Sequence, residues 1–293
     1  MLPQNARAGL LLALAAILIF AAQDGVSKHL AANYPPVFVV MVRYWAFALF
    51  VLVWATGRPG GLRAVARTSQ PVLQVARGAL LGLQVVIAIT AFAVVGLVPT
   101  MALFAAAPLV VAALSVPVLG ETVGWRRWTA IAVGFCGVMV ILRPGPGMLT
   151  SDIWMSLVAM IGIAIYSVMT RLASRKDRAE TSFFYTGIGG VAVLTLIGPF
   201  FWTGFEGWDW AWMGFACVTG AAGHYFLIRA FEVADAVVIQ PVTYLQIVFG
   251  AITGIVVFDE ALEWPVLLGA GIVLGAGLFS AWRDFVRSRA ARG

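Results

Sequence analysis

The stretch Ala91-Phe92-Ala93-Val94, followed by Glu121 and Trp125, recurs as Ala230-Phe231-Glu232-Val233, followed by Glu260 and Trp264. Every matched residue is displaced by 139 positions (230 − 91). Similarity at one fixed spacing is the sequence signature of a duplicated structural unit. The chain is therefore expected to fold as two related halves.

The composition indicates what surrounds both halves. Hydrophobic residues make up 62% of the chain, charged residues only 11%, and the mean hydropathy is +0.97. Soluble domains carry about 25% charged residues. Between Arg77 and Glu121, the 43 residues from 78 to 120 carry no charge. One helix of that length would be about twice as long as the ~30 Å hydrocarbon core is thick, so this segment is expected to cross a membrane, turn at Gly96 and Pro99, and cross again.

Apolar segments of spanning length predict ten transmembrane helices. Backbone groups in lipid must be hydrogen-bonded within each segment, and the alternation typical of barrel strands is absent, so the predicted fold class is an all-α polytopic membrane protein. The expected spans cover residues 9–31, 35–56, 73–95, 98–118, 125–142, 153–172, 181–202, 209–231, 236–257 and 264–284.

Basic residues predict the orientation, because loops on the cytoplasmic side carry an excess of Lys and Arg. With the N-terminus inside, all of the 19 basic residues except Lys28, Arg43 and Arg143 fall on the cytoplasmic side. Both termini are therefore predicted to be cytoplasmic in a multi-pass membrane protein. The same topology accounts for the net charge of +6, so nucleic-acid binding is not expected.

A Pro/Gly-rich connector at 143–152 divides the chain. It predicts a first repeat of five helices at 1–142, an extracytoplasmic linker at 143–152, and a second repeat of five helices at 153–293 that ends in a basic tail. Because each half has an odd number of helices, the second half enters the membrane from the opposite side. Inverted repeats around a central cavity suit transport by alternating access.

Charged residues inside the spans are the first candidates for a site, since they are costly in hydrocarbon. Asp24 and Lys28 are spaced i and i+4, so they are expected to pair on one helix face beside Gln23. Arg43 lies about 10 Å below Pro36 at helical rise, a depth that roughly matches Asp24. Three roles stay open for this cluster: a proton or cation carrier at Asp24, a site for the zwitterion of an amino acid, or a structural network.

Neutral polar residues supply further candidates near the expected midplane, from helices of both halves. Amides and phenols offer donors and acceptors to an amino acid without the cost of a buried charge. Hydrogen bonding between helices is an equally good explanation of any one of them. These residues are Gln84, Tyr166, His224, Tyr244 and Gln246.

Prolines and small residues predict how the helices bend and pack. Pro108 and Pro241 remove backbone hydrogen bonds within spans and are expected to act as kinks or hinges. The small-xxx-small pairs Ala130/Gly134 and Gly271/Gly275 are expected to pack the two halves together or to form a dimer. Glu121 and Glu260 precede Trp125 and Trp264, so each glutamate is expected to cap the helix that follows it.

Two parts of the sequence resemble the closing helices of EamA-type repeats from the drug/metabolite transporter superfamily. The first is the run Phe104 to Leu142, with Pro108, Gly120-Glu121, Trp128, Gly134 and Gly137, and the second comprises Asp259-Glu260 and Gly269 to Gly277. The Trp-Gly pair often found late in the first helix of such proteins is replaced by Ala21-Ala22-Gln23-Asp24-Gly25. The resemblance implies a basket of helices around a central cavity, without ATP hydrolysis. Among the branches of the superfamily, the pattern is similar to bacterial inner-membrane exporters of amino acids, aromatic ones included, which implies the bacterial inner membrane as the location.

The predicted function is a secondary transporter that exports amino acids or similar small metabolites. A proton-coupled multidrug exporter and a membrane-embedded enzyme are the alternatives. The sequence has no Gly-rich phosphate loop and no His/Cys cluster, so no catalytic residue, metal site or cofactor is predicted. The expected partners are a small-molecule substrate and the lipid bilayer, with the chain a monomer or a homodimer.

Overall fold

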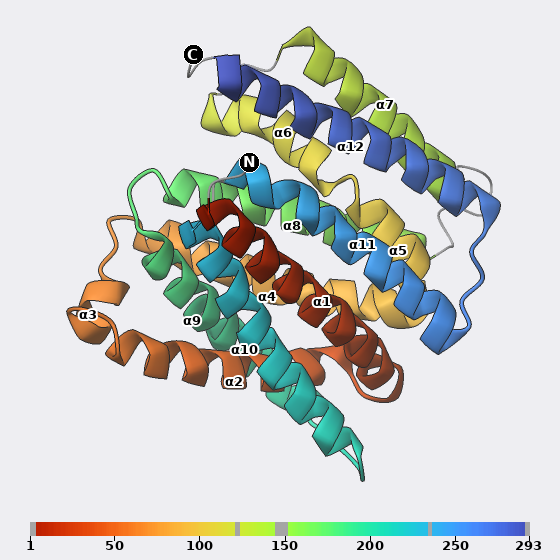
Figure 1. The fold of residues 1–293 in the computed structure, drawn as a ribbon. Helices are drawn as coiled ribbons and strands as arrows, with labels where there is room; N and C mark the ends of the chain where they lie inside the picture. The colour runs from red at the N-terminus through yellow and green to blue at the C-terminus, as the bar shows by residue number, and fades with distance from the viewer. Residues whose placement is uncertain (1–3, 121–123, 144–151, 234–235, 291–293) are drawn as a thin grey trace.

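A computed structural model describes residues 4–120, 124–143, 152–233 and 236–290, and every regular element within them is helical (Figure 1). The predicted linker lies outside the described residues except for its two ends, Arg143 and Asp152. Glu121 also lies outside them. The elements are α1 (Gln4–Asn33), α2 (Pro36–Thr56), α3 (Gly61–Ala66), α4 (Pro71–Val94), α5 (Leu97–Phe104), α6 (Ala107–Leu119), α7 (Trp125–Leu142), α8 (Ile153–Ala173), α9 (Ala179–Ile197), the 3₁₀ turn η2 (Gly198–Phe201), α10 (Asp209–Val233), α11 (Ala236–Phe258) and α12 (Trp264–Ala290).

The all-α membrane fold that the sequence predicts is confirmed. Within the described ranges, six helical segments are long and apolar enough to cross a membrane, and three shorter apolar helices occur in addition. The six are Arg7–Asn33, Pro36–Thr56, Pro71–Val94, Leu97–Leu119, Ile153–Ala173 and Ala179–Phe201. The count of ten spans remains a prediction.

Two local features differ from the expected spans. The span predicted at 98–118 is broken at Ala105 and Ala106 into α5 and α6, with Pro108 in the first turn of α6. Proline has no N–H to donate and fits best in the first turn of a helix, which accounts for the break just before it. The short helix α3 between α2 and α4 is too brief to appear in a pattern of spanning hydropathy.

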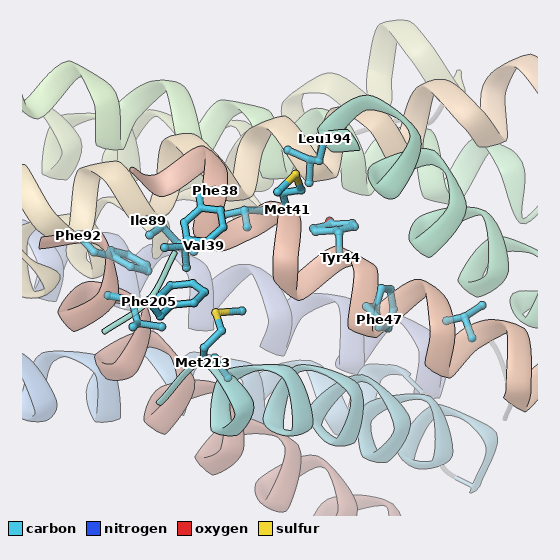
Figure 2. Close-up of a cluster of buried hydrophobic side chains, with 14 of the residues drawn as sticks. Phe38, Val39, Met41, Tyr44, Phe47, Ile89, Phe92, Leu194, Phe205 and Met213 are labelled. Carbon is cyan, nitrogen blue, oxygen red and sulfur yellow. The ribbon is translucent and has the colours of Figure 1, made fainter. Parts of the chain in front are cut away.

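The largest hydrophobic core surrounds α2. Phe38, Val39, Val40 and Met41 are fully buried there, and they pack with side chains of α4, α9 and α10 (Figure 2). Phe38 stacks on Phe205, with ring centroids 4.6 Å apart. This core joins helices from both sides of the linker.

Close packing between helices depends on glycine at two interfaces. α4 lies against α9, where a Cβ on Gly78 would be 3.0 Å from the Cα of Gly189. α7 lies beside α12 at one edge of the bundle (Figure 1), and a Cβ on Gly137 would be 2.9 Å from the carbonyl oxygen of Gly269. Both distances are shorter than normal contacts of a Cβ atom, so a larger residue would push the helices apart.

The small residues of α7 and α12 only partly match the expected interface. Gly134 faces Leu109 and Ala276, in agreement with internal packing. Gly271 and Gly275 are exposed, and nothing lies within 4 Å of the place where their Cβ atoms would be. The expectation that this second pair packs the two halves together is therefore wrong within the described residues, whereas its alternative role in a dimer stays a prediction. Gly269 and Gly277, on another face of α12, make the close contacts.

The halves are not packed alike. α1 packs against α10 and α11, and it also touches α4. Among the described residues, α8 and α10, which follow α1 and α4 by 139 positions, make no comparable contact with each other. The two halves therefore adopt different arrangements of equivalent helices.

Candidate functional site

α1 carries three polar residues close together in its C-terminal half. Gln23, Asp24 and Ser27 lie within about one turn, and Gln23 and Ser27 are buried. The Ser27 hydroxyl donates to the carbonyl of Gln23 at 2.7 Å. They are directed toward α2, α10 and α11, which supply their partners.

Asp24 binds an amide, not the lysine expected from the sequence. Gln246 on α11 donates from Nε2 to Oδ2 of Asp24 at 3.0 Å. Lys28 instead binds the carboxylate of Glu260, so the expected pairing of Asp24 with Lys28 is wrong. The i, i+4 spacing would allow Asp24 and Lys28 to pair. Lys28 instead pairs with Glu260, which lies in the loop between α11 and α12.

Arg43 on α2 completes this group. Its Nη1 donates to Ser27 Oγ at 3.0 Å, and the amide oxygen of Gln23 accepts from the guanidinium in the orientation that satisfies both groups. Arg43 and Asp24 are close enough to interact electrostatically but form no salt bridge in the described structure. We call Gln23, Asp24, Ser27, Arg43 and Gln246 the polar tier.

Asp24 and Arg43 share a further property. Both side chains are partly exposed, as is Gln246, whereas Gln23 and Ser27 beside them are buried. The two charged groups are therefore the members of the polar tier, with Gln246, that a substrate could contact.

Lys28 and Glu260 form a second group, toward the end of the bundle where α1 ends. Besides binding Lys28, the Glu260 carboxylate accepts from the backbone N–H groups of Leu97 and Val98, each at 2.7 Å. Lys28 also lies 4.4 Å from the ring centroid of Phe258. Glu260 thus caps α5 and not α12, the helix that follows it, so the capping role predicted for Glu260 was assigned to the wrong helix.

Gln84 and Tyr166 lie apart from the polar tier, at the interface of α4 with α8. Gln84 is buried and donates to the carbonyl of Ala159 at 3.2 Å. Tyr166 accepts from Nη1 of Arg77 at 2.9 Å. These contacts match the helix-to-helix bonding that the sequence left open for both residues.

Arg77 is a buried charged residue that the sequence analysis did not single out. It is only 1% exposed, and all five guanidinium N–H groups find neutral acceptors. Nε and Nη2 donate to Gln74, Nη1 donates to Tyr166 and Thr170, and Nη2 also donates to the carbonyl of Ser182. Because no donor is left over, Arg77 braces α4, α8 and α9. The signal available in the sequence was its position six residues after Pro71, inside a helix.

The same end of the bundle is held by Asp177, in the loop between α8 and α9. Its carboxylate accepts from the Thr68 hydroxyl, from Gln74 Nε2 at 2.9 Å and from the Ser69 N–H at 3.2 Å. Burial alone raises the pKa of Asp177, but these hydrogen bonds outweigh it and hold the pKa of the carboxyl below its usual value.

His224 on α10 lies among phenylalanines. Its ring centroid is 5.1 Å from that of Phe20 on α1 and 5.2 Å from that of Phe47 on α2. Phe183 on α9 is 6.5 Å away. Helices from both sides of the linker therefore meet at this histidine.

The remaining candidates have other positions. Tyr244 on α11 is buried and faces Gly277 of α12, on the side away from the polar tier. Pro241 lies within α11, and its side chain is outside the described residues. Within the part of the chain that the structure describes, no three His, Cys, Asp or Glu side chains are placed to hold a metal ion.

Comparison with known proteins gives consistent matches over most of the chain. The S-adenosylmethionine uptake transporter of Rickettsia felis is 27% identical over 272 residues, which cover 90% of this chain and 88% of that protein. The riboflavin transporter of Vibrio cholerae is 27% identical over 300 residues, which cover 97% of this chain and 96% of that protein. A solved crystal structure with 16% sequence identity and a TM-score of 0.64 covers 93% of this chain and 96% of its own, and so has the same fold.

The sequence profile of the EamA-like transporter family matches twice, over residues 7–143 and 150–282. The two matches cover most of the chain, and the relatives are named as transporters of small metabolites. The protein is accordingly a multi-pass membrane transporter of small metabolites and not an enzyme. The chain belongs to the EamA-like transporter family.

Proposed function

We propose that this transporter moves amino acids, or metabolites that carry an α-amino-acid group, and that the polar tier holds the zwitterion. The observation that carries the proposal is the separation of Asp24 from Arg43. Two opposite charges lie on neighbouring helices, interact electrostatically, and have neutral hydrogen-bond partners in place of each other. An ammonium group beside Asp24 and a carboxylate beside Arg43 would neutralise both.

The free-energy cost of burying charge in a membrane supports this assignment. An ionised side chain inside the bilayer is costly and usually faces a partner or a cavity. The amide of Gln246 and the hydroxyl of Ser27 orient Asp24 and Arg43 without neutralising either. A bound zwitterion would supply the missing charges in one step, and the charged pairs would be strong hydrogen bonds.

The relatives support the same substrate class in part. S-adenosylmethionine, named for the Rickettsia felis relative, carries an α-amino-acid group, whereas riboflavin, named for the Vibrio cholerae relative, does not. Both molecules contain a fused nitrogen heteroaromatic ring. The amino-acid group therefore fits one of these named substrates, and the ring is common to both.

The proposed mechanism is alternating access by two inverted halves, each of five helices, with the linker at 143–152 between them. We propose that both termini lie in the cytoplasm, as the distribution of basic residues predicts. Export is the direction proposed from the sequence, whereas the S-adenosylmethionine relatives are named as uptake transporters. For a transporter without a second driving ion, the net direction follows the substrate gradient, so exchange is the measurement to make first.

Exchange in proteoliposomes tests the proposal. Vesicles loaded with unlabelled methionine should take up labelled methionine, and Asp24→Asn and Arg43→Gln should each reduce the rate on the order of tenfold, or about 1.4 kcal/mol of substrate stabilisation. Glu263→Gln is the matched control, because it removes a charge from an exposed pair with Arg143.

Two results would contradict the proposal. The zwitterion site is wrong if Asp24→Asn and Arg43→Gln exchange methionine as fast as Glu263→Gln does. If exchange instead requires an imposed pH gradient in the original protein and loses that requirement in Asp24→Asn, Asp24 carries protons, and the proton-coupled exporter is the better description.

A further inference from the structure

The side chains around His224 form a second layer of the bundle interior, which we call the aromatic tier. It consists of Phe20 on α1, Phe47 on α2 (labelled in Figure 2), Phe183 on α9 and His224 on α10. Phe47 also contacts Phe183 edge to face, with centroids 5.4 Å apart. Three phenyl rings therefore surround one imidazole within 6.5 Å.

The imidazole of His224 has no hydrogen-bond partner among the described residues. Polar groups inside a protein are normally paired. The ring nitrogens of His224 are not among the fully buried unpaired atoms, because the residue is partly exposed, like Asp24 and Arg43. A leucine or phenylalanine would pack against these rings without the cost of removing imidazole from water. The ring nitrogens are therefore available to a ligand.

The aromatic tier lies in register with the polar tier. Phe20 precedes Asp24 by four residues on α1, and Phe47 follows Arg43 by four on α2. Since α1 and α2 run in opposite directions, both displacements point the same way along the bundle. Four residues of helix span about 6 Å, so the aromatic tier lies about one turn from the polar tier.

α10 repeats this relation. A Cβ on Gly220 would be 3.1 Å from the amide of Gln23, which belongs to the polar tier, and His224 follows Gly220 by four residues. Gly223 lets Phe20 approach α10, because a Cβ there would be 2.5 Å from that ring. α1 and α2 thus each present a polar and an aromatic side chain one turn apart, and α10 contacts Gln23 at Gly220 and presents His224 one turn further along.

From this geometry we propose that the aromatic tier binds a planar nitrogen heteroaromatic ring of the substrate, while the polar tier holds its α-amino-acid group. The inference rests on the proposed function and names a narrower substrate class. Phenyl rings offer stacking or edge contacts to a flat ring. The imidazole of His224 can donate one hydrogen bond and accept another, which suits the ring nitrogens and amino groups of a purine.

The opposing explanation is a packed histidine with no ligand role. It predicts that His224 matters for stability and that all substrates are affected alike. The subsite predicts selective loss of substrates that contain the heterocycle. S-adenosylmethionine and methionine form a matched pair of probes, because they share the α-amino-acid group and only the first carries an adenine ring.

The experiment measures inhibition of labelled methionine exchange by S-adenosylmethionine and by unlabelled methionine, and takes the ratio of their half-maximal concentrations. In the original protein S-adenosylmethionine should be the stronger inhibitor. In His224→Phe this preference should fall at least tenfold, and His224→Gln, which keeps a donor and an acceptor, should restore part of it. Tyr225→Phe on the same helix removes an exposed hydroxyl and should leave the ratio unchanged. An unchanged ratio in His224→Phe would overturn the inference.

Adenosine separates this inference from the proposed function, because it has the ring without the amino-acid group. Thermal stabilisation by adenosine that is lost in His224→Phe supports the subsite, even if methionine is not exchanged and the zwitterion proposal fails. Methionine exchange with neither stabilisation by adenosine nor preference for S-adenosylmethionine overturns the subsite alone. Absence of exchange, preference and stabilisation together overturns both.

Discussion

Lys28 on α1 and Glu260 in the α11–α12 loop are 232 residues apart in sequence and form an ion pair. Each side chain is 13% exposed. The same carboxylate accepts the N–H groups of Leu97 and Val98 at the start of α5. One side chain therefore joins three segments: α1, α5 and the loop.

Glu260→Gln should destabilise the protein. The substitution keeps the shape of the side chain but leaves Lys28 without its anion and weakens the cap of α5. Hydrogen bonds to charged groups contribute about 1.5–3 kcal/mol, so a loss of about 2 kcal/mol is expected as a lower melting temperature in detergent. Glu263→Gln, in a pair that is 49% and 55% exposed, should cost about 0.5 kcal/mol or less. Equal losses in the two variants would contradict the role assigned to Glu260.

Arg77→Lys should also lower the melting temperature, even though the charge is kept. Lysine offers three donors and no planar fork, so some of the acceptors on Gln74, Tyr166, Thr170 and Ser182 would lose their partners. The expected cost is about 2–4 kcal/mol, because buried polar atoms without a partner are unfavourable. Arg63→Lys on the exposed face of α3 is the control. If both arginines can be replaced with the same small effect, Arg77 is not a brace.

Asp177→Asn should remove a stabilising contribution that depends on pH. The folded-state pKa of Asp177 lies below the ordinary value of 3.8, so its ionised form favours the folded state. This contribution is complete above the unfolded pKa and disappears as the pH falls through the lowered folded pKa. Melting temperatures of the two proteins should therefore differ at neutral pH and converge below about 3.8. A difference that persists unchanged into strong acid would assign the effect to shape and not to charge.

Gly78→Ala should disrupt the contact of α4 with α9. The added Cβ would overlap the carbonyl oxygen of Tyr185 and approach Gly189 Cα to 3.0 Å, and backbone atoms cannot move aside as a side chain can. Overpacking of this kind costs about 1–3 kcal/mol. Gly271→Ala introduces the same methyl group where no atom lies within 4 Å, and should be neutral or slightly stabilising. Thermal unfolding of the two variants side by side decides whether contact or helix propensity governs the result.

Hydropathy was sufficient to predict the helical class. Backbone N–H and C=O groups in lipid must be hydrogen-bonded, and a helix satisfies them within a single segment. Hydropathy could not predict α3, which is short, or the break before Pro108, since a proline can bend or interrupt a helix. For the candidate site, sequence spacing placed Asp24 and Arg43 at similar depth. The structure places Asp24 against Gln246 and Arg43 against Ser27. Spacing along one helix could not show that Lys28 meets Glu260 or that Arg77 is enclosed, because those contacts depend on how distant helices pack.

The unequal contacts of α1 with α4 and of α8 with α10 bear on the energy landscape of the protein. Two inverted halves of identical sequence would have two states of equal free energy, related by exchanging the roles of the halves. Any bias must then come from positions where the copies differ, such as Lys28, whose counterpart 139 residues later is Ser167. For halves that are inverted as proposed, substitutions that make them more alike should bring the populations of the two states closer together, because differences between the copies would set the free-energy difference.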